Sequence, residues 1–187
     1  MISNYNFNSH HVGPKNVQDE FFNMTTEQIR NAVETGRSSM VSVCMNLTHD
    51  FNKASVVRAS NAFLGNSVFM VGKRRFDRRG TVGMHHYENV LHADELDDVF
   101  NLLIPKGYTF FAVDNSEGFT PRPVYDVDIP EKSAFIYGEE QKGLSKEVIE
   151  QCDAMIYIPQ YGVVRSLNVA QSAAVIMSEY ARRHRIC

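Results

Sequence analysis

The sequence has few cysteines, no long apolar run and no excess of positive charge. Its three cysteines, Cys44, Cys152 and Cys187, are scattered and odd in number, so we expect no disulfide framework, and a reducing cytoplasm fits. No apolar run approaches about 18 residues, so we expect no membrane span. The polar first residues lack the parts of a signal peptide. The net charge of -3 argues against coating nucleic acid through overall positive charge.

Several common cofactor, metal and hydrolase motifs are also missing. No Gly-x-Gly-x-x-Gly follows the first expected strand, and no Gly-x-x-x-x-Gly-Lys-Ser/Thr phosphate loop occurs. No Gly-x-Ser-x-Gly elbow of a serine hydrolase is present. The seven histidines and three cysteines never fall into a paired ligand spacing, and the adjacent His85 and His86 would point their rings in different directions. The sequence therefore predicts no metal site.

Expected strands and helices alternate along the chain, which indicates an α/β fold class with a mostly parallel sheet flanked by helices. A chain of 187 residues, 43% of them hydrophobic, is long enough for one well-buried domain. We expect residues 1–38 to form an N-terminal arm, irregular to about residue 24, and a short helix, and residues 39–187 to form the main domain. The expected strands are 39–45, 67–71, 108–113, 133–137 and 154–158. Two helices are expected over 25–36, which begins with a Thr25–Gln28 capping box, and over 53–64. Three more are expected to begin after the capping residues Asp94, Ser145 and Asn168, and the one after Ser145 is short.

Three segments in a fixed order carry a more specific signal. The first is Asn46-Leu47-Thr48-His49-Asp50-Phe51-Asn52, which runs into Val57-Arg58-Ala59-Ser60-Asn61; the second is Phe135-Ile136-Tyr137-Gly138-Glu139-Glu140-Gln141-Lys142-Gly143-Leu144-Ser145; the third runs from Ile158-Pro159 to Ser166-Leu167-Asn168-Val169. Together they resemble the three motifs of the SpoU/TrmH-type RNA 2′-O-methyltransferases of the SPOUT superfamily. The resemblance covers residues 39–184, which is most of the chain.

The resemblance implies a knotted SPOUT methyltransferase fold, with a deep trefoil knot at the C-terminus, and an S-adenosylmethionine pocket between two loops. One loop follows the strand 133–137 and the other contains Ser166-Leu167-Asn168. Five residues are implied as cofactor contacts: Val113, Gly138, Gly143, Ile158 and Leu167. Gly138, Gly143 and Gly162 would allow close backbone approach or unusual torsions. The alternative is that they are ordinary turn glycines, and this reading suits Gly162 nearly as well.

The resemblance also implies a catalytic set, namely Arg58, Asn52, Glu140, Ser166 and Asn168. A guanidinium stays protonated in proteins, so we interpret Arg58 as a clamp for the adjacent phosphate and the developing alkoxide rather than as a general base. Its alternative role is a solvated helix charge. Asn52 would orient Arg58 or the ribose, or cap its helix. Glu140 would be an orienting carboxylate, and the role of Glu139 stays open.

RNA contact is expected from a cationic segment, with Lys73, Arg74, Arg75, Arg78 and Arg79 around Phe76, and from Arg165. The implied partner is structured RNA, with tRNA favoured over rRNA because about 38 residues before the first strand are too few for a separate RNA-binding domain. A homodimer is also implied, since the last helix is apolar over a broad arc and the small Ala170, Ala173 and Ala174 would let another helix approach. The rival hypotheses are a knotted RNA-binding or ribosome-assembly factor without activity and a methyltransferase of unrelated fold.

Overall fold

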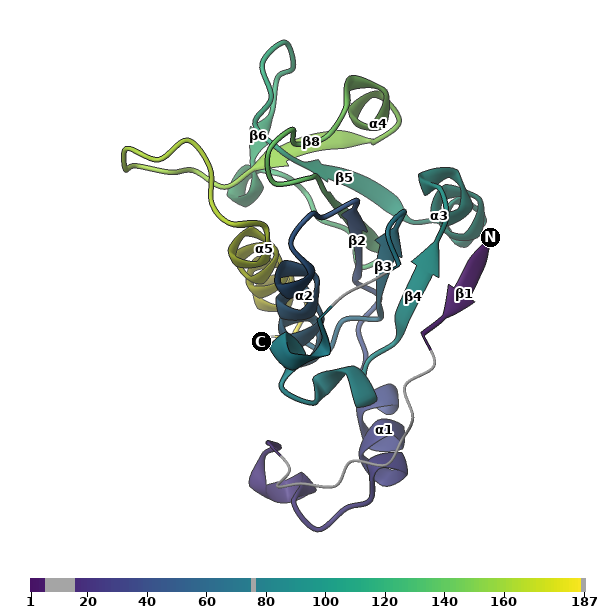
Figure 1. Ribbon diagram of the computed structural model, residues 1–187. Helices are drawn as coiled ribbons and strands as arrows, with labels where there is room; N and C mark the ends of the chain where they lie inside the picture. The colour runs from purple at the N-terminus through teal and green to yellow at the C-terminus, as the bar shows by residue number, and fades with distance from the viewer. Residues whose placement is uncertain (6–15, 75–76, 186–187) are drawn as a thin grey trace.

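The computed structural model describes residues 1–5, 16–74 and 77–185 (Figure 1). Within them, eight strands form one sheet of order β1-β4-β3-β2-β7-β5-β8-β6, in which every neighbouring pair is parallel except β1 and β4. The strands are β1 (Ile2–Asn4), β2 (Val41–Met45), β3 (Ser67–Val71), β4 (Val90–Ala93), β5 (Thr109–Val113), β6 (Arg122–Pro123), β7 (Ser133–Tyr137) and β8 (Ala154–Tyr157). The predicted α/β class with a mostly parallel sheet is confirmed, and the trefoil knot stays a prediction.

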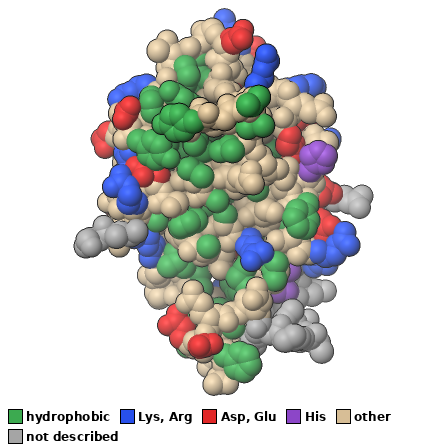
Figure 2. Space-filling model, turned by 90° about the vertical axis from the view of Figure 1, so that its left-hand side faces the viewer, with side chains coloured by type: hydrophobic (Ala, Val, Ile, Leu, Met, Phe, Trp, Pro, Cys, Tyr) green, Lys and Arg blue, Asp and Glu red, His purple; other side chains and the backbone are tan. Residues whose placement is uncertain are grey.

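Helices cover both faces of this sheet (Figure 1). They are α1 (Thr26–Thr35), α2 (Asp50–Ala62), α3 (Leu96–Leu103), α4 (Lys146–Glu150) and α5 (Val169–His184). Side chains alternate along each strand, so Phe135 and Tyr137 of β7 pack in the core under α2 and α5, whereas Ala134 and Ile136 pack in the core under α3 and α4. The face of the molecule that carries α2 and α5 shows hydrophobic side chains across its middle (Figure 2).

Two expectations about element boundaries were wrong. The first residues were expected to form an irregular arm, yet Ile2–Asn4 pairs with β4 as an antiparallel edge strand, and Ile2 packs against the core under α3. Helix α2 was expected to begin at Lys53, but it begins at Asp50 after the N-cap His49, so Asn52 is not its N-cap. The Thr25–Gln28 capping box of α1 is confirmed.

The strand order creates a switch point between β2 and β7. From β2 the chain moves outward through β3 to β4, and it later fills the other side with β5, β7 and β8. The connections therefore leave in opposite directions from the pair β2 and β7. In open parallel sheets, ligands bind outside the carboxyl ends of the strands at such a point. In the described part of the chain, no helix has the length and apolarity that crossing a membrane requires.

Candidate cofactor site and active site

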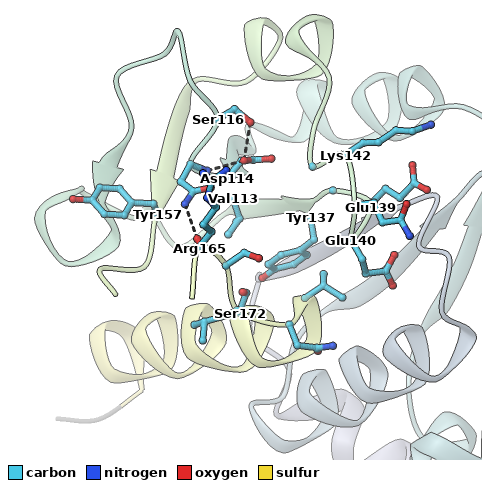
Figure 3. A pocket seen from close by; sticks show the side chains of 18 of the residues that line it. Val113, Asp114, Ser116, Tyr137, Glu139, Glu140, Lys142, Tyr157, Arg165 and Ser172 are labelled. Carbon is cyan, nitrogen blue, oxygen red and sulfur yellow. Dashed lines mark hydrogen bonds between the residues drawn. The ribbon is translucent and has the colours of Figure 1, made fainter. Parts of the chain in front are cut away.

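A cavity of about 580 Å³ lies at the carboxyl ends of the central strands, where the switch point predicts a ligand (Figure 3). Its walls are the loops that follow β2, β5, β7 and β8 together with the first turn of α5. All five predicted cofactor residues line it: Val113, Gly138, Gly143, Ile158 and Leu167. Four of the five predicted catalytic residues line it as well: Asn52, Glu140, Ser166 and Asn168. The fold thus brings together side chains from all three motif segments.

The loop after β7 turns back tightly on itself because of two glycines. The N–H of Gly143 donates to the carbonyl of Glu139 at 2.8 Å. A Cβ on Gly138 would lie 2.3 Å from the carbonyl carbon of Gly143, which no side chain could tolerate. Gly143 itself has a φ of 67°, a left-handed conformation that glycine adopts without strain. These two positions therefore require glycine for the loop to form the floor of the cavity.

A chain of hydrogen bonds joins the three motif segments at one edge of the cavity. The amide of Asn52 donates to Oε1 of Glu140 at 2.8 Å, and the amide of Asn168 donates to the side-chain oxygen of Asn52 at 3.0 Å. Asn168 in turn accepts from the N–H of Ala170 at 2.9 Å, so it caps α5 as predicted. Each amide is fixed in orientation by its neighbour, which pre-organises this edge of the cavity.

Glu140 also accepts from backbone N–H groups at the start of α2. Its carboxylate receives the N–H of Thr48 at 2.9 Å and that of His49 at 3.2 Å, and the neighbouring Glu139 accepts from the Thr48 hydroxyl at 3.0 Å. Burial favours the neutral acid, but the bonds from Asn52 and these N–H groups outweigh burial and lower the pKa of Glu140. Glu140 therefore favours the ionised form and holds the amide of Asn52 in place.

Arg58 does not line the main cavity. It is exposed on α2 and lines a shallow groove between α2 and α5, which Asn52 and Asn168 border from the cavity side. The rest of the groove includes the small residues Ala59, Ala62, Ala170 and Ala174. The small residues of α5 thus let α2 of the same chain approach. Ala173, which we expected at a helix surface, is instead fully buried in the core.

The predicted RNA-contact residues Lys73, Arg74, Arg78 and Arg79 are all exposed, and Arg75 and Phe76 lie outside the described residues. Two of these arginines already have partners. Arg74 stacks over the Tyr5 ring at 5.5 Å and donates to the carbonyl of Asn4 at 3.3 Å. Arg79 forms an ion pair with Asp77 at 2.6 Å.

A buried lysine is hydrogen-bonded to the start of this cationic segment. Lys53 of α2 is almost fully buried, and its ammonium donates to the carbonyl of Lys73 at 3.1 Å and lies 3.6 Å from Asp50. Burial lowers the pKa of Lys53, and Asp50 opposes that effect. The contact anchors the start of the cationic segment to α2, next to Asn52.

Several cavity residues were missed in the sequence. Asp114, Asn115 and Ser116 follow β5 and form a turn at the cavity wall, and Gln160 lines the cavity after β8. Figure 3 shows Asp114 and Ser116 on one side of the cavity and Glu139 and Glu140 on the other. A short run of polar residues directly after a strongly β-prone strand was the available signal, because such runs collect at the carboxyl edge of a parallel sheet.

The lining fits a nucleoside cofactor with an aminoacyl chain. Val113, Ile158 and Leu167 offer apolar contacts for a flat base. The buried side-chain oxygen of Gln160 has no hydrogen-bond partner among the described residues, so it is available to accept from a ligand amino group. Gly138 and Gly143 leave part of the loop after β7 without side chains where it lines the cavity. Across residues 1–5, 16–74 and 77–185, no three His, Cys, Asp or Glu side chains gather as a metal site; the predicted absence of a metal stays a prediction.

The chain belongs to the SpoU rRNA Methylase family, whose model matches residues 39–178. It is 35% identical over 104 residues to the tRNA (guanosine(18)-2′-O)-methyltransferase of Thermus thermophilus, an alignment that covers 56% of this chain and 52% of that relative. The chain thus spans about half the length of that curated relative.

The fold is shared with solved structures, including the following two. The A. aeolicus TrmH/SpoU tRNA modifying enzyme superposes with a TM-score of 0.75 at 23% identity, over 84% of this chain and 81% of that one. The SpoU methyltransferase AviRb from Streptomyces viridochromogenes, in complex with the cofactor AdoMet, superposes with a TM-score of 0.69 at 22% identity, over 79% and 58% of the two chains.

Proposed function

We propose that this protein transfers the methyl group of S-adenosylmethionine to a ribose 2′-oxygen of structured RNA. The observation that carries the proposal is the hydrogen-bonded chain Glu140–Asn52–Asn168, which joins all three motif segments at one edge of a cavity. Family membership supports the same reaction class, and the fold is shared with a SpoU methyltransferase in complex with AdoMet. Val113, Gly138, Gly143, Ile158 and Leu167 would hold the cofactor, which supplies an activated methyl group when bound.

The residues at the mouth of the cavity supply orientation and charge. A ribose 2′-hydroxyl is barely ionised at neutral pH, so the site must place it well and stabilise the charge that develops on its oxygen. Arg58 clamps the adjacent phosphate and the developing alkoxide, and the proton leaves through the phosphate or water. Asn52 and Asn168 border the groove that carries Arg58, and Glu140 fixes Asn52. Ser166 lies two residues before Asn168 in the third motif segment and contacts cofactor or ribose.

We infer that the substrate is tRNA rather than rRNA. The Thermus thermophilus relative is a tRNA methyltransferase, and the A. aeolicus neighbour is a tRNA modifying enzyme. Lys73, Arg74, Arg75, Arg78, Arg79 and Arg165 would contact its phosphates, and the reaction would take place in the cytoplasm. The division into an N-terminal part of 38 residues and a main domain from residue 39 belongs to the same proposal.

We further propose a homodimer. Tyr161 and Val163 in the loop before α5 are almost completely exposed, at 97% and 103%, and Val164 is 65% exposed. Side chains this apolar seldom stay in water on a monomer. The same loop continues into Arg165, Ser166 and Leu167 of the cavity wall. A second copy that covers Tyr161, Val163 and Val164 would therefore also hold the cavity wall in place.

The test is methyl transfer from labelled S-adenosylmethionine to bulk tRNA and, separately, to rRNA. We expect labelled tRNA, with a 2′-O-methyl nucleotide found by mass spectrometry after nuclease digestion. Labelled rRNA alone would reverse the substrate preference. Cofactor and RNA binding without transfer to either RNA would favour the alternative, a non-catalytic RNA-binding or ribosome-assembly factor.

A further inference from the structure

Asp114 directly follows β5 and bonds to the loop after β7. Its Oδ2 accepts from the N–H of Leu144 at 2.7 Å, and its Oδ1 accepts from the N–H of Asn115 at 2.7 Å. The same Oδ1 accepts from the Ser116 hydroxyl at 2.8 Å (Figure 3). Its own N–H donates to the carbonyl of Ile156 in β8 at 3.1 Å. Both carboxylate oxygens are thus engaged, and the backbone that carries them is hydrogen-bonded to β8.

The next residue holds the opposite wall of the cavity. The side-chain amide of Asn115 donates to the carbonyl of Arg165 at 3.2 Å, across 50 positions of the chain. Arg165 directly precedes Ser166 and Leu167 in the loop before α5. Two consecutive residues at the end of one strand therefore bond to both loops that enclose the cavity.

We propose that Asp114 and Asn115 form a latch that sets the spacing of the two cavity loops, which makes both of them positioning residues for cofactor binding. The inference rests on the proposed function, because it assumes that S-adenosylmethionine occupies this cavity. No residue of the latch belongs to the predicted cofactor or catalytic set. Its role is to hold Gly143–Leu144 and Arg165–Leu167 where the cofactor needs them.

The position requires a carboxylate, because both of its oxygens must accept hydrogen bonds. Three donors converge on two oxygens, so an amide at residue 114 would turn an NH2 group toward a donor and lose at least one bond. The fit is also tight, since a Cβ on Gly143 would lie 2.6 Å from Oδ2 of Asp114. The Asp114 carboxylate therefore fits only against a glycine at residue 143, and its bond to the Leu144 N–H fixes the position of the loop after β7.

The experiment measures S-adenosylmethionine affinity by calorimetry for the full chain and for Asp114→Asn, Asn115→Ala and Asp153→Asn. Asp153 is the matched control, because its carboxylate likewise accepts a backbone N–H, that of Phe110 in β5 at 2.7 Å, but near the other end of that strand and outside the cavity. We expect Asp114→Asn to weaken binding by about tenfold or more, as for a lost hydrogen bond to a charged group, and Asn115→Ala by less. Asp153→Asn should bind like wild type.

Two further readouts separate positioning from general stability. In the cofactor-free protein, the Leu144 N–H should exchange faster with deuterium in Asp114→Asn than in Asp153→Asn. In methyl transfer, Asp114→Asn should raise KM for the cofactor and leave KM for RNA unchanged. Asn115 is exposed, so Asn115→Ala keeps the test valid even if the Asp114 variant folds poorly.

The outcomes distinguish the two proposals. Failure of the wild-type chain to bind S-adenosylmethionine overturns the proposed function and the latch with it. Tight binding by wild type, together with unchanged affinity in both Asp114→Asn and Asn115→Ala, overturns the latch alone. Equal weakening in Asp153→Asn also overturns it, because the effect would then reflect the stability of β5.

Discussion

The side-chain amide of Asn52 donates a hydrogen bond of 2.8 Å to Glu140, a residue 88 positions away in the sequence. Asn52 stands in the first turn of α2, and Glu140 stands in the loop after β7. Because β2 and β7 are neighbours in the sheet, the segments that follow them emerge side by side. This bond joins the first motif segment to the second, and the bond from Asn168 adds the third.

Replacing Glu140 by glutamine should damage both fold and activity. The carboxylate receives the N–H groups of Thr48 and His49 as well as the amide of Asn52. A glutamine would turn an NH2 group toward one of these donors, which costs about 1–3 kcal/mol. We expect the unfolding free energy, measured by urea denaturation at neutral pH, to fall by that amount and methyl transfer to fall strongly. Glu147→Gln on α4 is the control, and equal effects of the two variants would contradict a specific role.

The Glu140 effect should depend on pH in a defined direction. The pKa of Glu140 is lowered in the folded protein, against burial, by bonds from Asn52 and the backbone. Its contribution to stability is therefore present above the ordinary carboxyl pKa and is lost as the pH falls through the lowered folded value. The stability difference between wild type and Glu140→Gln should shrink in acid. A difference that grows below about pH 4 would refute this account.

Arg58→Ala should leave cofactor affinity nearly intact and remove methyl transfer. Arg58 lies in the groove beside the cavity rather than in it, so the cofactor contacts stay in place. The expected loss is roughly 2.7–4 kcal/mol or more, as for a lost oxyanion donor. Arg58→Lys should rescue little, because an ammonium cannot reproduce a planar two-pronged grip. Single-turnover rates of methyl transfer test both Arg58 variants, and Arg30→Ala on α1 is the control. An Arg58→Lys rate near that of wild type would rule out the bidentate clamp.

The cationic segment should not contribute evenly to RNA binding. Arg79 forms an ion pair with Asp77 at 2.6 Å, which neutralises part of its charge, whereas Arg78 is an exposed neighbour on the same turn. We expect Arg78→Ala to weaken RNA binding and to reduce the slope of log affinity against log salt by about 1. Arg79→Ala should change both the RNA affinity and the salt slope less. Filter binding over a series of salt concentrations provides the measurement, and the reverse order of effects would show that RNA displaces Asp77 from Arg79.

Local signals in the sequence predicted the parts of the site that depend on neighbouring residues. A short polar residue before an apolar periodic run predicted the cap at Asn168, and the structure confirms its bond to the N–H of Ala170. The Thr25–Gln28 capping box was found for the same reason. Each of these interactions closes within a few residues, so the chain needs no tertiary contact to specify it.

Contacts between segments far apart in the sequence could not be predicted from such local signals. The pairing of Ile2–Asn4 with β4 joins residues about 90 positions apart, and nothing in a three-residue strand specifies its partner. The apolar arc of α5 could not reveal that Ala173 packs inside while Ala170 and Ala174 line a groove with α2. Asp114 escaped notice because its role depends on Leu144, which arrives only when β5 and β7 pair.

The exposed apolar loop before α5 gives the sharpest test of the homodimer. Val163 is 103% exposed, and a charge there cannot disturb any packing within the chain. Val163→Glu should therefore leave the fold of the single chain intact, as measured by circular dichroism, but dissociate the proposed dimer, since an interface core excludes unpaired charge. Ile104→Glu is the matched control, because Ile104 is an exposed apolar residue, 59% exposed, in the turn after α3. Sedimentation should give a dimer for wild type and Ile104→Glu and a monomer for Val163→Glu. Methyl transfer should fall with the dimer, because the same loop carries Ser166 and Leu167 of the cavity wall; a wild-type monomer with full activity would contradict the proposal.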